Sequence, residues 1–550
     1  MTETENSLIL FGEVDDWTEK LQIGAAAAKL TKKPIVNRVV CRSGEDPGGV
    51  CMPMNLMPEE FDGVYDAVII GGGVVGTAVL RELSKWKLKT ILIEKECDLA
   101  FHASGRNDGM IHPGFAAKPG SKKAYYNVRG NAMYTQLTKD LKVPFIRQGS
   151  MILLAHPLYR LAVPYMLYRA KKNGVPGCRY VSKKELKKIE PNLACRAAGA
   201  FLMPTSGQLF PQKLVCALAE NAVSNGAEVR LETAAADFRF EGGRIVEVIT
   251  NRGVIKTKAV INAAGGWADV VAAKAGDPFF TLHFRKGEDL ILDKKAGAFI
   301  GKIYAMPRLS QLKSKSKGGG LVPTVEGNVL VGPTAHEVCS RDDYSTHADD
   351  IEELGKHIRL NGKLSAGQII TYFAGIRACS YHEDFIVEPS KRIGNLFHLA
   401  AIQSPGLASA PALAEEAAKW LIALLSEKEA VHPNENFNPV REDKRYDFDL
   451  MNEDEKDAFL KMNPLYGKIV CRCEQVSEGE IRDVLRSNPA PMTLDGIRHR
   501  ARAMTGRCHG GFCTPRIVKI MMDELNLKVT EVYKKNRLSP LFFGETKGEE

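Results

Sequence analysis

One stretch of the sequence, YDAVIIGGGVVGTAVLRELSKWKLKTILIEK at residues 65–95, indicates the fold class of the chain. It begins with DAVII, an uninterrupted apolar run of the kind found in buried parallel strands. Gly71, Gly73 and Gly76 follow in the spacing G-x-G-x-x-G, and TAVLRELSKW then has helical spacing. A second apolar run, TILIE, ends at Glu94. Together these features predict a Rossmann-like dinucleotide-binding unit.

The glycines and the acidic residue have physical roles in such a unit. Glycines permit a tight turn, so that a pyrophosphate can approach the N-terminus of the following helix. The carboxylate of Glu94 is expected to accept hydrogen bonds from ribose hydroxyls. The fingerprint alone leaves FAD and NAD open. The next segment, ECDLAFHASGRNDGMIHPGF (96–115), is polar and glycine-rich where a nicotinamide enzyme would continue a regular βαβ pattern, which favours FAD.

Length and composition exclude several classes of protein. The chain has 550 residues, 44% of them apolar and 26% charged, which predicts several globular domains. Its net charge of +9 is spread along the sequence, which argues against nucleic acid as a partner and suits an anionic substrate. No run of 18 apolar residues occurs, so we expect no transmembrane segment. The acidic N-terminus lacks a basic targeting region, and we expect a cytoplasmic protein.

The cysteines fall into two groups. Eight of the twelve are scattered singly, which argues against a disulfide framework and for a reducing compartment. The other four form two close pairs, Cys471-x-Cys473 and Cys508-x4-Cys513. Four thiolates on two loops can hold either zinc or an iron–sulfur cluster. This spacing departs from the C-x2-C pairs that are usual for zinc.

Several segments resemble known families. Four of them resemble the flavin-contacting segments of the D-amino-acid-oxidase superfamily: 96–115, AVINAAGGWAD (259–269), YFAGIRACS (372–380) and IQSPGLASAPALAEEAAKWL (402–421). Five motifs are similar to the group of glycerol-3-phosphate oxidases and dehydrogenases and L-2-hydroxyglutarate dehydrogenases: RNDGMIHPGF, FRKGEDLIL, VPTVEGNVLVGPTA, EDFIVEP and QSPGL. The C-terminal region resembles the BFD-like [2Fe–2S] domain, in the form found in the large subunits of anaerobic glycerol-3-phosphate dehydrogenases.

These resemblances imply the residues of two cofactor sites. The residues implied to contact FAD are Gly71, Gly73, Gly76, Glu94, Ser104, Arg106, Asn107, Gly265, Gly375 and Gly406. The residues implied to hold the cluster are Cys471, Cys473, Cys508 and Cys513. Near the cysteines, Ser477-x-x-Glu480 predicts a capping box at the start of a helix, and Thr514-Pro515 predicts the start of another.

Three further residues are predicted to act on the substrate. His112 is the candidate base, because an unperturbed histidine pKa of about 6.5 suits a proton acceptor near neutral pH. Arg377 is the preferred clamp for an anionic group, since arginine binds phosphate or carboxylate through two parallel hydrogen bonds. Lys286 is the second candidate. A clamp of this kind does not separate glycerol 3-phosphate from 2-hydroxy acids.

The predicted architecture is α/β. We expect a Rossmann-like FAD-binding domain with an inserted β-rich substrate domain, followed by a small α-helical [2Fe–2S] domain. The predicted ranges are an N-terminal extension of unknown role (1–62), the oxidoreductase (63–430) with its substrate lobe at about 121–200 and 275–370, a linker (431–463), the cluster domain (464–530) and a tail (531–550). Within the extension, WTEKLQIGAAAAKLTKK (17–33) predicts a short helix.

The expected activity is oxidation of glycerol 3-phosphate, or of a similar small anionic alcohol, by hydride transfer to flavin. The cluster would pass electrons singly to an acceptor protein or a quinone pathway, and peripheral membrane contact through a partner subunit stays open. One alternative is a dehydrogenase of L-2-hydroxyglutarate, another 2-hydroxy acid or an amino acid. Another alternative, from a different class, is an electron-transfer or iron-handling module. Zinc at the four cysteines is a third.

Overall fold

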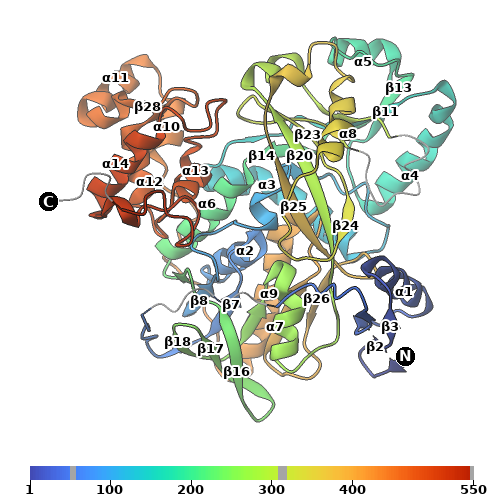
Figure 1. The fold of residues 1–550 in the computed structure, drawn as a ribbon, viewed down its shortest axis with the longest axis vertical. Coiled ribbons are helices and arrows are strands. Elements are labelled where there is room, and N and C mark those ends of the chain that lie inside the picture. Colours follow the sequence, from blue (N-terminus) through green and yellow to red (C-terminus); the bar gives the residue numbers. More distant parts are fainter. Residues whose placement is uncertain (50–51, 53–56, 308–318, 545–550) are drawn as a thin grey trace.

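The computed structural model describes residues 1–49, 52, 57–307 and 319–544, so the last six residues of the predicted tail lie outside the described part. The N-terminal segment and the C-terminal helices lie on opposite sides of a large central body (Figure 1). Among the described residues, no helix is long and apolar enough to span a membrane.

The predicted dinucleotide-binding unit lies in a six-stranded sheet of order β15-β8-β7-β19-β27-β26. All neighbouring strands are parallel except β26 and β27. The strands are β7 (Ala67–Ile70), β8 (Thr90–Ile93), β15 (Glu228–Arg230), β19 (Val260–Asn262), β26 (Ile386–Pro389) and β27 (Leu396–Ala400). The two apolar runs of the quoted stretch form β7 and β8, and every residue of both strands is buried.

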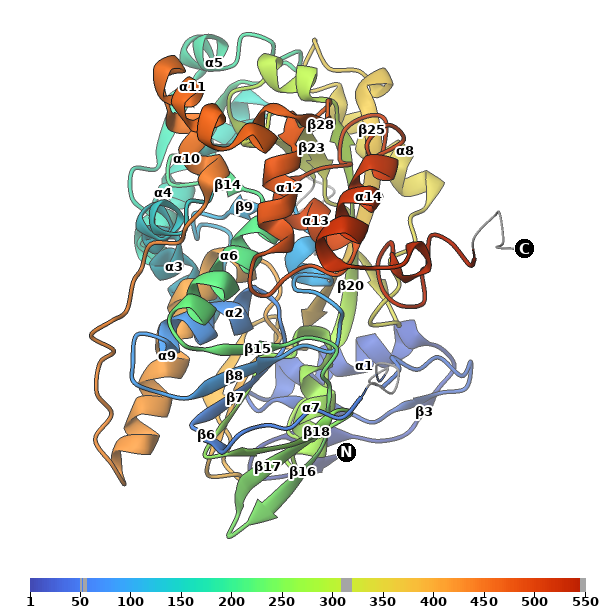
Figure 2. The same ribbon diagram turned by 90° about the vertical axis from the view of Figure 1, so that its left-hand side faces the viewer.

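Both faces of this sheet are covered (Figure 2). On one face, Ile69 and Leu92 pack into an apolar core with four helices: α2 (Val74–Leu83), α3 (Lys122–Asp140), α6 (Pro211–Ser224) and α9 (Gly406–Ser426). On the other face, Val68 and Ile91 pack against α7 (Ala268–Lys274) and the antiparallel strands β16 (Ala235–Glu241), β17 (Arg244–Thr250) and β18 (Gly253–Thr257). A sheet buried on both sides requires the continuous apolar runs that the sequence contains.

A second, nine-stranded sheet forms the predicted substrate lobe, in the order β12-β13-β11-β21-β22-β23-β20-β24, with β25 also paired to β20. Its strands are β11 (Ser150–Leu154), β12 (Arg179–Ser182), β13 (Gly199–Met203), β20 (His283–Leu292), β21 (Ile303–Ala305), β22 (Gly320–Pro323), β23 (Val329–Gly332), β24 (His336–Val338) and β25 (Ile369–Cys379). The long pair β20 and β25 connects this lobe to the first sheet (Figure 1). The lobe thus extends past the predicted ends at 200 and 370.

The N-terminal extension is a folded unit. Strands β2 (Leu8–Leu10) and β4 (Ile35–Asn37) are parallel, and helix α1 (Trp17–Leu30) connects them. The helix confirms the prediction for residues 17–33. The unit is attached to the oxidoreductase by hydrogen bonds from Thr281 N to Ile35 O (3.0 Å) and from Asn37 Nδ2 to the Tyr381 hydroxyl (3.1 Å).

The C-terminal region is a small helical domain with its own core. Its helices are α12 (Glu478–Leu485), α13 (Leu494–Ala501) and α14 (Thr514–Leu525). The predicted capping box between Ser477 and Glu480 is present. Helix α14 begins one residue earlier than predicted, because Thr514 donates its hydroxyl back to Gly510 O (2.7 Å) instead of capping the helix.

A buried ion pair attaches this domain to the oxidoreductase. Arg500 on α13 donates to both carboxylate oxygens of Asp98, at 2.6 and 2.9 Å. Both side chains are almost completely buried. Beside them, the rings of His499 and Phe101 meet edge to face at 5.2 Å. Asp98 and Phe101 belong to the loop that follows β8, so the helical domain is bound to the polar segment predicted to contact flavin.

Replacing Arg500 with leucine should destabilise this contact strongly. The change leaves the Asp98 carboxylate buried without its partner, and such a change costs about 3–5 kcal/mol. The free energy of unfolding is measured in urea, following the helical domain. The control is Arg537→Ala, which breaks a half-exposed pair with Glu232 (2.9 Å) between the same two parts and should cost less than about 1 kcal/mol. Equal effects of the two substitutions would contradict the central role of the buried pair.

Candidate active site

The glycine turn between β7 and α2 is closed too tightly for side chains. A Cβ atom at residue 76 would lie 2.0 Å from the carbonyl oxygen of Gly71, so α2 starts directly against the turn. Gly71 has a φ of +116° and its missing Cβ would lie 2.5 Å from Ala263 O. Ala263 belongs to the segment 259–269, so the two predicted cofactor segments are packed against each other. This arrangement needs glycine at both positions.

The surroundings of the turn fit a dinucleotide. Buried Glu94 accepts hydrogen bonds from Gly72 N (2.5 Å) and Glu96 N (2.9 Å), and burial raises the pKa of its carboxyl. Ser104 Oγ accepts from Val74 N (2.9 Å) in the first turn of α2. Gly265 has a φ of +55°, with no heavy atom within 4 Å of where its Cβ would stand. A helix start beside a glycine turn and a nearby buried acid are features of dinucleotide-binding sites.

Two polar residues of the predicted flavin loop hold the loop itself. The Asn107 amide donates to Ala103 O and Ser104 O, both at 2.9 Å, and its oxygen accepts from Gly109 N. Arg106 Nε donates to Phe101 O (3.0 Å), and its guanidinium also lies 4.2 Å from the centre of the Tyr344 ring.

The main chain of Arg106 explains another predicted glycine. A Cβ atom at Gly375 would lie 2.0 Å from Arg106 O, so the loop lies directly on β25. Gly375 therefore allows the close approach between the loop after β8 and the long strand of the substrate lobe.

His112 lies between the flavin loop and the start of α9. Its Nε2 is 3.4 Å from Ser404 Oγ, next to the N-terminus of α9 at Gly406. Its carbonyl oxygen accepts from the side chains of Asn127 (2.7 Å) and Asn131 (2.9 Å) on α3. The main chain at His112 is thus held by α3 while its ring faces Ser404. The structure brings these two segments together from positions far apart in the sequence.

Arg377 extends from β25 across a glycine on the neighbouring strand. A Cβ atom at Gly287 would lie 2.4 Å from Arg377 Nη2, so only glycine leaves room for the guanidinium. Its Nη1 donates to Thr334 O (3.3 Å), and burial lowers the pKa of the group. Nearby, burial raises the pKa of Asp289 well above its usual range. Among the described residues, Arg377 has a hydrogen-bond partner only at Nη1, which leaves most of its five N–H donors available to a ligand.

The second clamp candidate, Lys286, does not join Arg377. The register pairs Arg285 with Arg377 and Gly287 with Gly375, and alternate residues of a strand point to opposite faces. Lys286 is therefore on the opposite face of the sheet from Arg377. Its buried Nζ contacts Asp343 (2.9 Å), Ser345 (3.0 Å) and His347 (3.1 Å). One small anion cannot bind both cations.

A network beside the site was missed by sequence reasoning. Arg285 donates to Glu337 (2.7 Å) and Glu383 (2.6 Å), and Glu383 accepts from Gln403 (3.0 Å). Burial alone would raise the pKa of Glu383, but the Arg285 hydrogen bond and charge lower it to about 2. The network fixes Gln403 next to Ser404. No local pattern signals it, because its members come from four separate segments.

The four predicted cysteines converge as two pairs. Cys473 Sγ lies 3.7 Å from Cys508 Sγ, and Cys471 interacts with Cys513 in the same way. The hydrogen bond from Cys513 lowers the pKa of Cys471, which favours the metal-binding thiolate. Two sulfurs on one tetrahedral metal, at bonds of about 2.3 Å, are separated by about 3.8 Å. Two such pairs fit the two iron atoms of a [2Fe–2S] cluster, with Cys473 and Cys508 on the exposed side.

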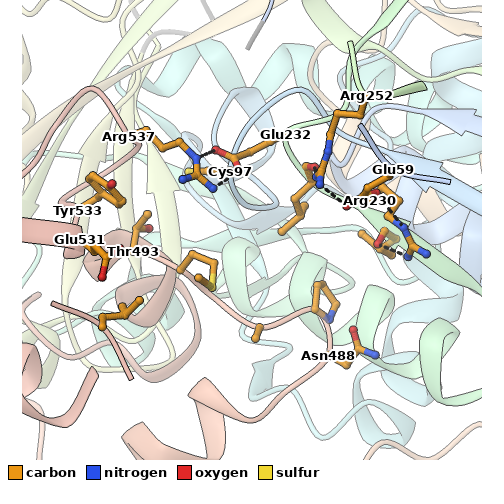
Figure 3. Close-up of a pocket in the computed structure, with 16 residues that line it drawn as sticks. Glu59, Cys97, Arg230, Glu232, Arg252, Asn488, Thr493, Glu531, Tyr533 and Arg537 are labelled. Carbon is orange, nitrogen blue, oxygen red and sulfur yellow. Dashed lines mark hydrogen bonds and ion pairs between the residues drawn. The ribbon is translucent and has the colours of Figure 1, made fainter. Parts of the chain in front are cut away.

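A cleft of about 360 Å³ lies elsewhere, between β15 and the helical domain (Figure 3). Three arginines line it, and each has an acidic partner: Arg230 and Arg252 pair with Glu59, and Arg537 pairs with Glu232. Since its cations are neutralised, this cleft offers little to an anionic substrate. It marks the junction of the two domains.

Comparison with known proteins agrees with this geometry. Residues 66–420 match the model of the DAO family, described as FAD dependent oxidoreductase, and residues 469–523 match the BFD-like [2Fe-2S] binding domain. The chain therefore belongs to the DAO family of FAD-dependent oxidoreductases, and its cofactors are FAD and a [2Fe–2S] cluster.

Within this family the enzyme is glycerol-3-phosphate dehydrogenase-like. It is 36% identical to glycerol 3-phosphate dehydrogenase of Caloramator mitchellensis, over 88% of this chain and 100% of the relative. It is 29% identical to mitochondrial L-2-hydroxyglutarate dehydrogenase of Nematostella vectensis, over 56% of this chain and 70% of the relative. Its fold resembles FAD-bound L-alpha-glycerophosphate oxidase from Mycoplasma pneumoniae, with a TM-score of 0.63 and 26% identity over 69% and 98% of the two chains.

Replacing Gly76 with alanine should abolish tight FAD binding. The added Cβ would clash with the Gly71 carbonyl and force α2 away from the turn, and we expect FAD affinity to fall at least tenfold. The measurement is bound FAD per chain, from the absorbance of protein dialysed at known free FAD. The control is Gly355→Ala on helix α8 (Ala348–Ile358), where no heavy atom lies within 4 Å of the added Cβ. Full FAD occupancy in Gly76→Ala would contradict the assignment of this turn.

Proposed function

We propose that this enzyme is a glycerol-3-phosphate dehydrogenase whose electrons leave through the [2Fe–2S] cluster. The observation that carries the proposal is the similarity to a glycerol 3-phosphate dehydrogenase along that relative's whole length. Two features of the site support it: a partly satisfied guanidinium on β25, and a histidine held at the start of α9.

Arg377 binds the phosphate of the substrate in this proposal. Its planar fork can donate two parallel hydrogen bonds to phosphate oxygens, while Nη1 stays anchored by Thr334 O. Gly287 leaves the space in which the guanidinium lies. Because the surroundings are largely buried, the attraction between the guanidinium and the anion is stronger than in water.

His112 accepts the proton of the substrate's secondary hydroxyl at Nε2. The substrate hydroxyl takes the place of Ser404 Oγ, which lies 3.4 Å from Nε2, as the partner of that nitrogen, and α3 fixes the main chain through Asn127 and Asn131. Removing that proton makes the carbinol carbon a better hydride donor. FAD, when bound, supplies the hydride acceptor, and the cluster, when bound, supplies one-electron transfer.

The electrons leave at the exposed edge of the cluster domain. Around exposed Cys473 and Cys508 lies a surface of Arg472, Phe512 and Arg516, which we call the exit surface. Both guanidinium groups lie over the Phe512 ring, at 4.6 and 5.0 Å from its centre, and all three side chains are exposed. A basic surface with an aromatic centre suits an acidic electron-acceptor protein. A quinone pathway reached through a partner subunit is the other proposed acceptor.

A second substrate class uses the same clamp. L-2-Hydroxyglutarate carries carboxylates, which Arg377 can bind as it binds phosphate, and the similarity to L-2-hydroxyglutarate dehydrogenases supports this class. The free cysteines support a reducing, cytoplasmic location in either case.

Anaerobic titration of the purified enzyme with glycerol 3-phosphate tests the substrate. We expect the flavin absorbance to bleach, followed by bleaching of the cluster. Bleaching with L-2-hydroxyglutarate and none with glycerol 3-phosphate would replace the proposed substrate with the second class. A spectrum that responds to no small anion would favour an electron-transfer module instead.

Replacing His112 and Arg377 should separate their roles. His112→Asn is expected to slow flavin reduction by about 10²–10⁴-fold, the usual contribution of a general base. Arg377→Lys is expected to raise KM for glycerol 3-phosphate about ten- to one-hundred-fold, because the bidentate contact is lost. Both are measured by anaerobic stopped-flow, with Arg239→Lys, an exposed residue of β16, as the control. An unchanged reduction rate in His112→Asn would remove His112 from the mechanism.

Reversing the charge of the exit surface should impair only the transfer of electrons from the cluster to the acceptor protein. In the double variant Arg472→Glu/Arg516→Glu we expect at least a tenfold lower kcat/KM with an acidic ferredoxin as acceptor. Reduction of the flavin by substrate should be unchanged. The control is Lys519→Glu, an exposed neighbour on α14 that does not contact Phe512 through a cation–π interaction. Loss of binding to anionic vesicles, with unchanged ferredoxin kinetics, would instead assign this surface to a membrane.

A further inference from the structure

Metal-ligating side chains gather in the substrate lobe, outside the residues assigned to FAD and to the cluster. They are His336 on β24 and the two carboxylates Asp350 and Glu353 on α8. One ligand atom from each lies within 4.8 Å of the other two. His336 Nε2 is 2.6 Å from Asp350 Oδ1. No role in FAD binding or in the chemistry of the substrate accounts for this group.

The fold brings these residues together on one face of the sheet. His336 pairs directly with Lys286 in the register of β24 and β20, so its side chain is on the face opposite Arg377. Helix α8 packs over β20 and β23 on this face. Asp350 and Glu353 are three positions apart on α8, so they share the side of the helix that meets His336.

A fourth acidic side chain lies behind the group. Glu288 is two residues from Lys286 on the same face of β20, and only 1% of its surface is exposed. Its Oε1 is buried with no hydrogen-bond partner among the described residues, and its Oε2 accepts from His347 N (3.2 Å). The carboxyl of Glu288 lies next to that of Asp350. Two adjacent carboxyl groups, one of them fully buried, require a proton or a cation between them.

The amino group of the nearby Lys286 already has polar partners. Lys286 is the cation whose charge acts on Glu288, yet its Nζ is held by Asp343, Ser345 and His347. The ion pair with Asp343, at 2.9 Å, offsets its charge. A cation bound where His336 presents an imidazole nitrogen would offset the charges of Asp350 and Glu288.

We infer that His336, Asp350 and Glu353 bind a divalent transition-metal ion, with Glu288 as a buried carboxylate beside it. One imidazole nitrogen with carboxylate oxygens suits Mn²⁺, Fe²⁺ or Zn²⁺, since imidazole favours transition metals and carboxylates also accept Mn²⁺. The ion would tie α8 to β24 and β20. Because β20 also carries Gly287, against which Arg377 packs, the metal would stabilise the strand that shapes the clamp.

Titration of the complete enzyme with Mn²⁺ tests this site, with free Mn²⁺ followed by its electron paramagnetic resonance signal. Mn²⁺ is a suitable probe because it prefers nitrogen and oxygen ligands over the cluster thiolates. After dialysis against a chelator, the unmodified enzyme should bind one Mn²⁺ per chain. In His336→Ala/Glu353→Gln the affinity should fall at least tenfold. Zn²⁺ should displace the bound Mn²⁺ from the unmodified enzyme.

The matched control is Glu352→Gln, which removes the same charge from the adjacent, exposed position of α8. Flavin and cluster absorbance report that each variant is folded. Binding retained in Glu352→Gln and lost in the double variant supports the site. Mn²⁺ binding that does not saturate, or that is equal in all three proteins, overturns it. Mn²⁺ binding and the cofactor absorbance are both measured without substrate, so the test does not depend on the proposed activity.

Discussion

The buried ion pair between Asp98 and Arg500 determines how the two cofactor-binding parts meet. Both charges are removed from water and the two groups form two parallel hydrogen bonds, so loss of Arg500 would leave the Asp98 carboxylate buried without its cationic partner. Asp98 lies only four residues after Glu94, the acid at the end of β8. The loop between β8 and His112 is thus held by the cluster domain at one end and by β25, through Gly375, at its middle. One loop therefore connects the geometry of both cofactor sites.

The antiparallel pair β20 and β25 divides the substrate lobe into two chemical environments. Arg285, Gly287 and Arg377 share one face, where the network to Glu383 and Gln403 supports the start of α9. Lys286 and Glu288 occupy the other face, beneath α8. Since neighbouring residues of a strand point in opposite directions, adjacent positions of FRKGED face different surroundings. A shift of the β20 backbone caused by a residue on one face would also move the residues on the other face.

The N-terminal extension also reaches the FAD region. Arg341 donates to Gly48 O (2.7 Å) and pairs with Asp269 (2.7 Å), and the Trp267 indole donates to Gly49 O (3.2 Å). Trp267 and Asp269 belong to the segment 259–269 that packs on Gly71. The extension is therefore in contact with both the substrate lobe, at Tyr381, and the second cofactor segment. Through these contacts the extension packs against segments that form the candidate active site.

Features that arise from short-range constraints could be predicted from the sequence. The glycine spacing at 71–76, the buried runs of β7 and β8, the Ser477 capping box and the two cysteine pairs are each set by neighbouring residues. Tertiary structure alone decided that Lys286 faces away from Arg377, because strand register depends on residues about 90 positions apart. It also decided the partnership of Asp98 with Arg500 and the gathering of His336, Asp350 and Glu353. Such contacts carry no local pattern, since each residue alone resembles an ordinary surface charge.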